Sequence, residues 1–332
     1  MDFQRKHFDP GAVGGTVLDG SGTVAYRSPV PPHDVYVYGT RTILALNVAL
    51  ATRRPLLISG EPGSGKTTLA RNAAAVLGWW YYDDTITSRT KARDLQWTFD
   101  ALRRLNDATT PGLGLRPESN YVEPGPIWWA FAPRTAGNRG DATMPASSHA
   151  QDRGAKPVER AKDKAVLLLD EIDKADPDVP NDLLEPFDVR RFRVAETGFV
   201  ATAARDVLLA LTTNGERELP PAFLRRCVTL RLDPPTRDWF VQIAEQRLGP
   251  DELHGRVADE VMKLRKAARR AGLREPSTGE YLDALETCRE LRIDPGSSIW
   301  ADVAHTVIWK HDRRPELEPE ETGQEIERDT TP

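Results

Sequence analysis

The residues with the clearest chemical meaning form a glycine-rich loop, Gly60-Glu61-Pro62-Gly63-Ser64-Gly65-Lys66-Thr67-Thr68. Its spacing, G-x-x-x-x-G-K-[ST], follows an apolar run at 55–59 and precedes a helix-like segment at 67–77, which is the context of a phosphate-binding P-loop. Backbone N–H groups of the loop and of the helix N-terminus would surround phosphate oxygens. Lys66 would reach the β- and γ-phosphates, and the Thr67 hydroxyl would bind Mg²⁺. A glycine-rich surface turn is the alternative, and the flanking segments disfavour it.

Two adjacent acids, Asp170 and Glu171, follow the apolar run Val-Leu-Leu-Leu. Such a run is typical of a buried parallel strand, and open α/β sheets bind their ligands at the carboxyl ends of the strands. Asp170 could hold Mg²⁺, largely through water, and Glu171 could polarise the attacking water as general base. The alternative is a solvated acidic loop, which the upstream P-loop disfavours.

Asn214 and the pair Arg225-Arg226 are weaker candidates when taken by themselves. Asn214 ends another apolar strand, where it could orient the water or contact the γ-phosphate, but Asn-Gly also favours plain turns. The two arginines end a short helix-like segment and could stabilise a phosphoryl group held by a neighbouring subunit. Surface arginines favoured by the helix dipole are the simpler interpretation of the residues alone.

The order of these motifs resembles the AAA+ ATPases, and among them the MoxR-like group. The resemblance covers about residues 36–291 and rests on four stretches, RPLLISGEPGSGKTTLA, GPIWWAF, LLLDEIDKADPDVPNDLLEPFD and LPPAFLRRC. It implies hydrolysis of ATP with Mg²⁺. The implied roles are Walker A for Lys66 and Thr67, Walker B for Asp170 and Glu171, sensor 1 for Asn214, and trans-acting arginine finger for Arg226, with Arg225 as the adjacent candidate. Residues 190–202 become the hairpin before sensor 1.

Two features depart from that group. Gly279 stands where the sensor 2 arginine is expected, so either Arg274 or another arginine of the helical domain replaces it, or the subunit couples nucleotide only weakly to the position of the lid. The MoxR-like group also carries a hairpin inserted in a helix, and here residues 125–131 could begin one.

The elements that must position these residues predict an α/β fold, a parallel sheet flanked by helices at 35–233, followed by a small all-α lid domain at 234–312. We expect residues 1–34 to form an extended lead-in, residues 132–163 to form a disordered insertion, and residues 313–332 to form an acidic disordered tail. The expected core elements are a helix over 40–51, a central strand at 55–59, a strand at 79–82, an amphipathic helix over 91–106, and strands at 206–213 and 227–232. Helices are expected at 239–248, 253–271, 277–291 and 298–310.

Charge and composition limit the partners. The net charge of the 332 residues is −5, and residues 315–332 hold seven acids and one base, so the rest of the chain sums to about +1. This balance gives no support for nucleic-acid binding. We expect a cytoplasmic protein without a membrane span. The two cysteines have no metal-type spacing, the chain has no apolar run of about 18 residues, and its start shows no signal-peptide pattern.

The resemblance implies an ATP-hydrolysing hexameric ring of identical subunits that remodels or activates a protein client, often with a von Willebrand factor A-type partner. Segments 127–131 and 88–97 are the candidate client-facing parts, although core positions for Trp97, Trp128 and Trp129 are slightly favoured. One alternative is a nucleic-acid-directed motor of a defence or restriction type, served by Arg190, Arg191 and Arg193. The other is a switch that binds ATP with little turnover, which Gly279 keeps open.

Overall fold

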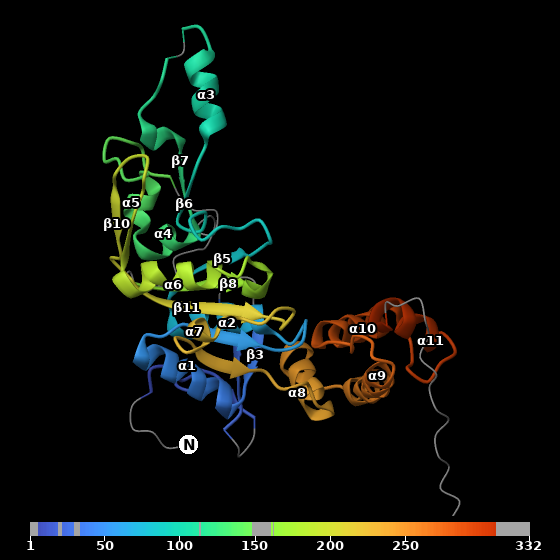
Figure 1. The fold of residues 1–332 in the computed structure, drawn as a ribbon. Helices are drawn as coiled ribbons and strands as arrows, with labels where there is room; N and C mark the ends of the chain where they lie inside the picture. The colour runs from blue at the N-terminus through green and yellow to red at the C-terminus, as the bar shows by residue number, and fades with distance from the viewer. Residues whose placement is uncertain are drawn as a thin grey trace, which may run out of the picture. The chain divides into compact units, whose positions relative to one another are not determined.

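The computed structural model describes residues 6–18, 22–29, 34–112, 114–147, 161 and 163–309. The chain divides into two units, Met1–Pro234 and Pro235–Pro332, one residue beyond the predicted boundary. The first unit is built on a parallel sheet in the order β12-β4-β11-β8-β5 (Figure 1). Its strands are β4 Leu56–Ser59, β5 Trp80–Thr85, β8 Lys164–Asp170, β11 Asp206–Thr213 and β12 Val228–Arg231. The predicted parallel sheet is confirmed, but β11 is its central strand, and β4 lies between β11 and β12.

Helices cover both faces of this sheet, because successive strand residues point to opposite sides. In β11, Leu208 and Ala210 belong to a core that α1 and α2 complete, whereas Leu209 and Leu211 belong to a core that α4 and α6 complete. Figure 1 shows α1 and α6 on opposite sides of the sheet. These helices are α1 Thr40–Thr52, α2 Lys66–Leu77, α4 Pro126–Phe131 and α6 Val179–Val189. The flanked sheet therefore matches the predicted fold class.

The N-terminal residues fold against this core, so the prediction of an extended lead-in over 1–34 is wrong for the described part. They form an antiparallel sheet from β1 Thr16–Val17, β2 Val24–Arg27 and β3 Val35–Tyr38. Phe8 is fully buried, and its backbone N–H donates to Asn47 Oδ1 at 2.9 Å. The strands are too short for their periodicity to stand out among the glycines and prolines.

Residues 91–106 do not form the predicted amphipathic helix. The segment contains a turn, the short strand β6 Trp97–Phe99 and the start of α3 Ala101–Thr109. Asp100 separates the two by capping α3, since its side chain accepts from the backbone N–H of Arg103 at 2.9 Å. The side chains of Leu102 and Leu105 are 76% and 58% exposed rather than packed with the core.

An antiparallel strand pair lies just before residues 125–131, which the sequence suggested as the possible beginning of an inserted hairpin. Strand β7 Val122–Pro124 pairs antiparallel with β6, and α3 lies between them in an arm that extends from the sheet (Figure 1). Residues 125–131, where a hairpin was expected, form helix α4, since Pro126 occupies its first turn.

The segment expected to be a disordered insertion at 132–163 is folded in its described part. It begins with α5 Pro133–Gly137, and the hydroxyl and N–H of Ser147 both donate to the carbonyl of Gly137. Residues 148–160 and 162 lie outside the described residues, as does the predicted acidic tail at 313–332.

Trp97 of β6 and Trp128 of α4 are core residues. Trp128 is fully buried, its indole donates to Thr135 Oγ1 at 3.0 Å, and its ring stacks on Phe199 with centroids 5.6 Å apart. Trp97 is 6% exposed and stacks on Phe192 at 5.8 Å. The core interpretation of these tryptophans is confirmed, and the predicted hairpin over 190–202 (β9 Arg191–Arg193, β10 Val200–Thr202) supplies their partners.

We expect Trp128→Ala to lower the free energy of unfolding by about 3–5 kcal/mol, because it removes a fully buried ring and leaves a cavity. Urea unfolding followed by circular dichroism measures this change. Leu102→Ala is the matched control, expected to cost no more than about 0.5 kcal/mol at an exposed site. Equal small changes in both variants would show that the Trp128 ring does not support the core.

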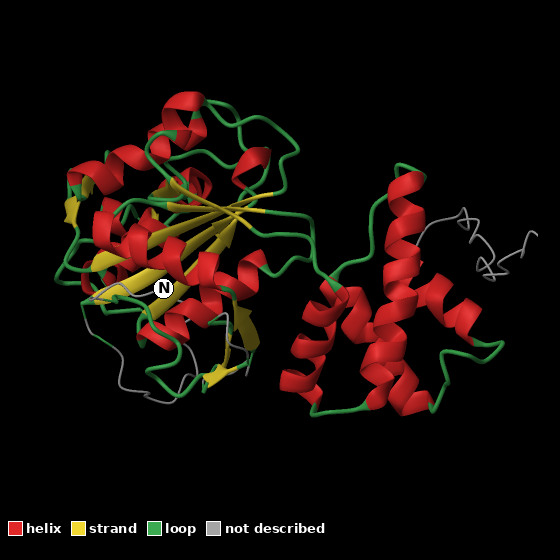
Figure 2. Ribbon diagram, turned by 90° about the horizontal axis from the view of Figure 1, so that it is seen from below, coloured by secondary structure: helices red, strands yellow, loops and turns green. Residues whose placement is uncertain are grey.

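The described residues after Pro234 form helices alone, as Figure 2 shows in red. They are α8 Arg237–Leu248, α9 Glu252–Arg270, α10 Thr278–Leu291 and α11 Trp300–Val303, followed by a π-helical turn, η4 Ala304–Trp309. The single helix predicted over 298–310 is thus two short elements, with Lys310 outside the description. None of the helices described in either unit is long and apolar enough to cross a membrane.

Candidate active site

The glycine-rich loop runs from the end of β4 into the first turn of α2. Gly63 and Gly65 have φ values of 75° and 89°, which other residues adopt only with strain. A Cβ on Gly60 would lie 2.9 Å from Ser64 Oγ and 3.2 Å from Leu232 Cβ, so the loop closes around a position that only glycine fits. These three constraints fold residues 60–68 into a tight cradle.

The cradle has unused hydrogen-bonding capacity that suits an anion. The Ser64 hydroxyl is buried and has no hydrogen-bond partner. The first N–H groups of a helix have no acceptor within the helix, and α2 directs its own toward the loop. Buried polar groups are normally paired, so the site fits a phosphate that would accept from them.

Lys66 is held at the centre of the site by neutral acceptors. Its ammonium donates to the carbonyls of Gly60 at 2.8 Å and Glu61 at 3.0 Å, and to Asn214 Oδ1 at 2.7 Å. The residue is only 7% exposed, and burial lowers the pKa of the ammonium, while the carboxylate of Asp170 opposes that shift. A phosphate would supply the buried cation with an anionic acceptor.

Asp170, at the end of β8, is brought next to the P-loop threonine. Thr67 Oγ1 donates to Asp170 Oδ2 at 2.8 Å, and Thr212 donates to the other carboxylate oxygen. Among the described residues, no three or more His, Cys, Asp or Glu side chains gather as a metal cage. A Mg²⁺ ion at Thr67 and Asp170 would therefore draw its other ligands from phosphate and water, as this ion usually does.

Glu171 turns away from the strand in the left-handed region, with φ 63° and ψ 48°. Its backbone N–H donates to Thr212 Oγ1 at 2.9 Å. Its carboxylate accepts from Asn214 Nδ2 at 3.2 Å and from Lys174 Nζ at 2.7 Å. A strained conformation of a non-glycine residue, which costs on the order of 1–3 kcal/mol, is common at functional sites.

Direct hydrogen bonds thus join Lys66, Asn214 and Glu171, and the pair Thr67 and Asp170 is connected to Glu171 through Thr212. Asn214 lies between β4 and β8 because β11 separates these strands, so its amide reaches both Lys66 and Glu171. Sequence reasoning missed Thr212 and Lys174. Thr212 could have been found, since it is two residues before Asn214 and therefore lies on the same side of the strand.

The structure does not bring Arg225 and Arg226 to this site. They precede β12, which runs parallel to β4 with Val228 opposite Leu56. Arg226 lies in the turn between α7 and β12, two residues before β12 begins opposite the first residue of β4, whereas Gly60 follows the last residue of β4. The arginines therefore lie at the edge where the strands begin, opposite the P-loop.

The helical unit offers no free arginine at the position proposed as a sensor 2 substitute. Gly279 is in the first turn of α10. Arg274 pairs with Glu280 at 2.9 Å, and Glu280 also accepts from the backbone N–H of Ser277 in the capping box of that helix. Arg274 therefore has a partner within its own unit.

Residues 143–227 match the protein family described as AAA domain (dynein-related subfamily). The match includes Asp170, Glu171, Asn214 and both arginines, whereas the P-loop lies upstream of it. The search of curated proteins finds no match. Two solved structures are similar. A candidate ATPase from Cytophaga hutchinsonii is 14% identical over 69% of this chain, with a TM-score of 0.38. A point mutant of Thermotoga maritima RuvB is 16% identical over 76%, also with a TM-score of 0.38.

The alignments span 61% of the Cytophaga chain and 69% of the RuvB chain. The AAA-domain match and the hydrogen-bonded P-loop site together define the class. Residues 143–227 are thus similar to an AAA domain, and they bring Asp170 and Asn214 to a P-loop that is built to bind a nucleotide phosphate.

Proposed function

We propose that this ATPase forms a homo-oligomeric ring, a hexamer in the implied arrangement, and uses ATP hydrolysis to remodel a protein partner, as a MoxR-like chaperone would. The observation that carries the proposal is the position of Arg225 and Arg226 at the sheet edge opposite the P-loop. An arginine there cannot serve its own nucleotide, but it can serve one held by a second copy. The nucleotide would then lie between subunits.

The side chains of one copy divide the work on ATP. Mg²⁺, held by Thr67 and Asp170, would neutralise phosphate charge. Lys66 would bind the terminal phosphates, and Glu171 would take a proton from the attacking water. Asn214 would orient that water, because its amide already contacts both Lys66 and Glu171. Arg226 of the next copy would stabilise charge on the transferred group, with Arg225 beside it.

Two observations support the MoxR-like form of the proposal and a protein client. The chain carries a pair of antiparallel strands joined through a helix, β6–α3–β7, in the region where the MoxR-like group has its inserted hairpin. The chain outside the acidic tail is nearly neutral, and Arg190 is bonded to Asp206 at 3.1 Å instead of being available for a phosphate backbone. A von Willebrand factor A-type protein is the partner that we propose to test first.

We expect Arg226→Ala to bind ATP normally and to lose turnover by about 10³-fold, because an arginine finger acts on charge developing in the transition state. Glu171→Gln should also be inactive. Mixing the two variants should restore phosphate release, since the Glu171→Gln copy supplies Arg226 to a site that retains Glu171. Phosphate release against mixing ratio is the measurement.

The control mixes Arg226→Ala with the double variant Arg226→Ala/Glu171→Gln, which offers no arginine and should restore nothing. Full independence of the two defects would reject a shared site. Binding of DNA or RNA that weakens steeply with salt would favour a nucleic-acid-directed motor over a protein client.

A further inference from the structure

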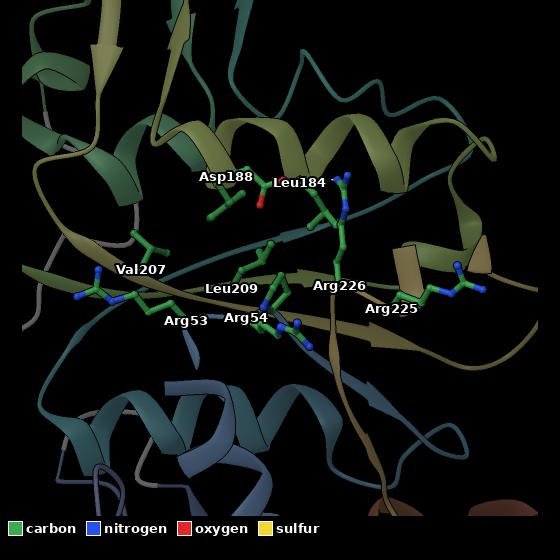
Figure 3. Close-up of a pocket in the computed structure, with 10 residues that line it drawn as sticks. Arg53, Arg54, Leu184, Asp188, Val207, Leu209, Arg225 and Arg226 are labelled. Carbon is green, nitrogen blue, oxygen red and sulfur yellow. Dashed lines mark hydrogen bonds and ion pairs between the residues drawn. The ribbon is translucent and has the colours of Figure 1, made fainter. Parts of the chain in front are cut away.

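A pocket of about 270 Å³ opens at the edge of the sheet where the strands begin (Figure 3). Its apolar side is formed by the buried Leu184 and Leu209 with Phe187 and Val207. Its charged lining consists of four arginines and one acid, namely Arg53, Arg54, Arg225, Arg226 and Asp188. The pocket therefore combines one apolar side with an excess of three positive charges.

This positive charge is poorly compensated. Among the residues that the structure describes, Arg53, Arg54 and Arg225 take part in no ion pair, and Arg226 meets Asp188 only at 3.5 Å, with both side chains more than half exposed. An exposed pair of this length contributes little and is easily broken. Guanidinium groups bind phosphate through two parallel hydrogen bonds, so a phosphate group is the ligand chemistry that this pocket favours.

The backbone places Arg54 beside Arg226. Arg53 ends α1 in the left-handed region, with φ 56°, and turns the chain so that Arg54 leads directly into β4. Val228 N–H donates to the carbonyl of Pro55 at 2.8 Å, so the chain just before β4 lies next to the turn at 225–227 that follows α7. Arg54 and Arg226 therefore line one pocket at the edge of the sheet where β4 and β12 begin.

The four side chains do not point the same way. In Figure 3, Arg54 and Arg226 lie between Arg53 and Arg225, whose guanidinium groups point away to opposite sides; Arg226 extends toward Leu184 of α6, and Arg54 lies below Leu209. Arg54 is also near enough to Cys227 to lower the pKa of its thiol slightly, against the larger effect of burial, which raises that pKa to about 11. Arg54 and Arg226 are therefore the two arginines between which an anion in this pocket would lie.

We propose that Arg54 is a second trans-acting cation, which binds with Arg226 to the terminal phosphates of ATP held on a neighbouring copy of the chain. This inference rests on the proposed function, because it requires nucleotide between two copies. The apolar wall behind the pair would reduce solvent screening, so both guanidinium groups would act more strongly on the phosphates than exposed arginines do. Arg54 would then contact substrate and qualify as a catalytic residue.

The test uses the full chain carrying Arg54→Ala. We expect turnover at saturating ATP to fall by about 10²-fold, the usual loss when one preorganised donor to a transition state is removed. Binding of a fluorescent ATP analogue by the dilute protein should stay within about twofold of wild type, because the chain's own P-loop lies at the other edge. Arg134→Ala, which removes an exposed arginine in α5, is the matched control and should keep full turnover.

Mixing supplies the decisive measurement. Lys66→Ala cannot hold ATP but still offers Arg54, so adding it to Arg54→Ala should restore turnover and also prove that both variants are folded. Adding the double variant Lys66→Ala/Arg54→Ala should restore nothing. Arg54→Lys keeps the charge without the fork of donors and should recover turnover only in part.

Full turnover of Arg54→Ala, a loss that Lys66→Ala does not restore, or weakened ATP binding by the dilute variant would each overturn the proposal. These outcomes differ from failure of the proposed function. If Arg226→Ala and Glu171→Gln also fail to restore each other, the shared site itself is wrong. If those two restore each other while Arg54→Ala is fully active, the ring ATPase stands and only the role of Arg54 is lost.

Discussion

Lys66→Ala is expected to abolish ATP binding. The ammonium is the buried cation of the cradle, and its acceptors are two carbonyls and the amide of Asn214, which a phosphate would replace as the stronger acceptor. Charge-assisted hydrogen bonds contribute about 1.5–3 kcal/mol each, so losing two of them would weaken binding by at least roughly 100-fold. Isothermal titration with ATP and Mg²⁺ measures the loss.

Lys263→Ala is the control for this experiment. Lys263 is half exposed and pairs with Glu260 at 3.1 Å within α9, so its removal changes the charge equally without touching the P-loop. ATP affinity of Lys263→Ala should equal that of the wild type. Tight ATP binding retained by Lys66→Ala, in a chain with unchanged circular dichroism, would contradict the assignment of residues 60–68 as the phosphate cradle.

The sequence predicts best where the chemistry is local. The P-loop needs only contiguous residues, because Gly63, Gly65 and Lys66 belong to one short loop and would surround the same phosphate. The apolar runs before Asp170 and Asn214 likewise identify buried strands, because strands covered on both faces admit few polar residues. That these two strand ends lie next to the P-loop follows from the parallel order of the sheet, and the structure shows it.

The errors come from segments whose meaning depends on distant partners. Leu95, Phe99, Leu102 and Leu105 have helical spacing, yet the first two contribute to the core through a turn and a strand, and the last two lie exposed on α3. Phe8 is buried by residues far along the chain, among them Tyr38, whose ring centroid lies 5.2 Å from its own, and Asn47, which accepts from its backbone. No local pattern contains such information, since the contact is made in the folded state alone.

The hydrogen bonds of the site also link the phosphate-binding lysine, Lys66, to the proposed general base, Glu171. Asn214 accepts from Lys66 and donates to Glu171, and Lys174 holds the other oxygen of Glu171. When a phosphate takes over Lys66, the Asn214 carbonyl loses its donor, and the amide is free to reorient around Glu171. Occupancy of the cradle can therefore change the surroundings of the proposed base without any movement of the sheet.

Glu171→Gln is expected to bind ATP and to stop turnover. The substitution keeps the shape of the side chain, and its amide oxygen can still accept from Lys174 or Asn214, so the cradle should keep its geometry. It removes the basic oxygen that takes the proton of water, a contribution of about 10²–10⁴-fold in rate. Phosphate release under saturating ATP measures the loss, and light scattering should find the oligomer held in its ATP-bound form.

Glu185→Gln, an exposed substitution on α6, should hydrolyse ATP at the wild-type rate and controls for the change of charge. Normal hydrolysis by Glu171→Gln would mean that another group activates the water. The wild-type rate decides a separate question, because a switch would bind ATP and assemble without sustained phosphate release. In that case Glu171→Gln would differ little from the wild type, whereas a ring ATPase requires the two to differ by the full contribution of the base.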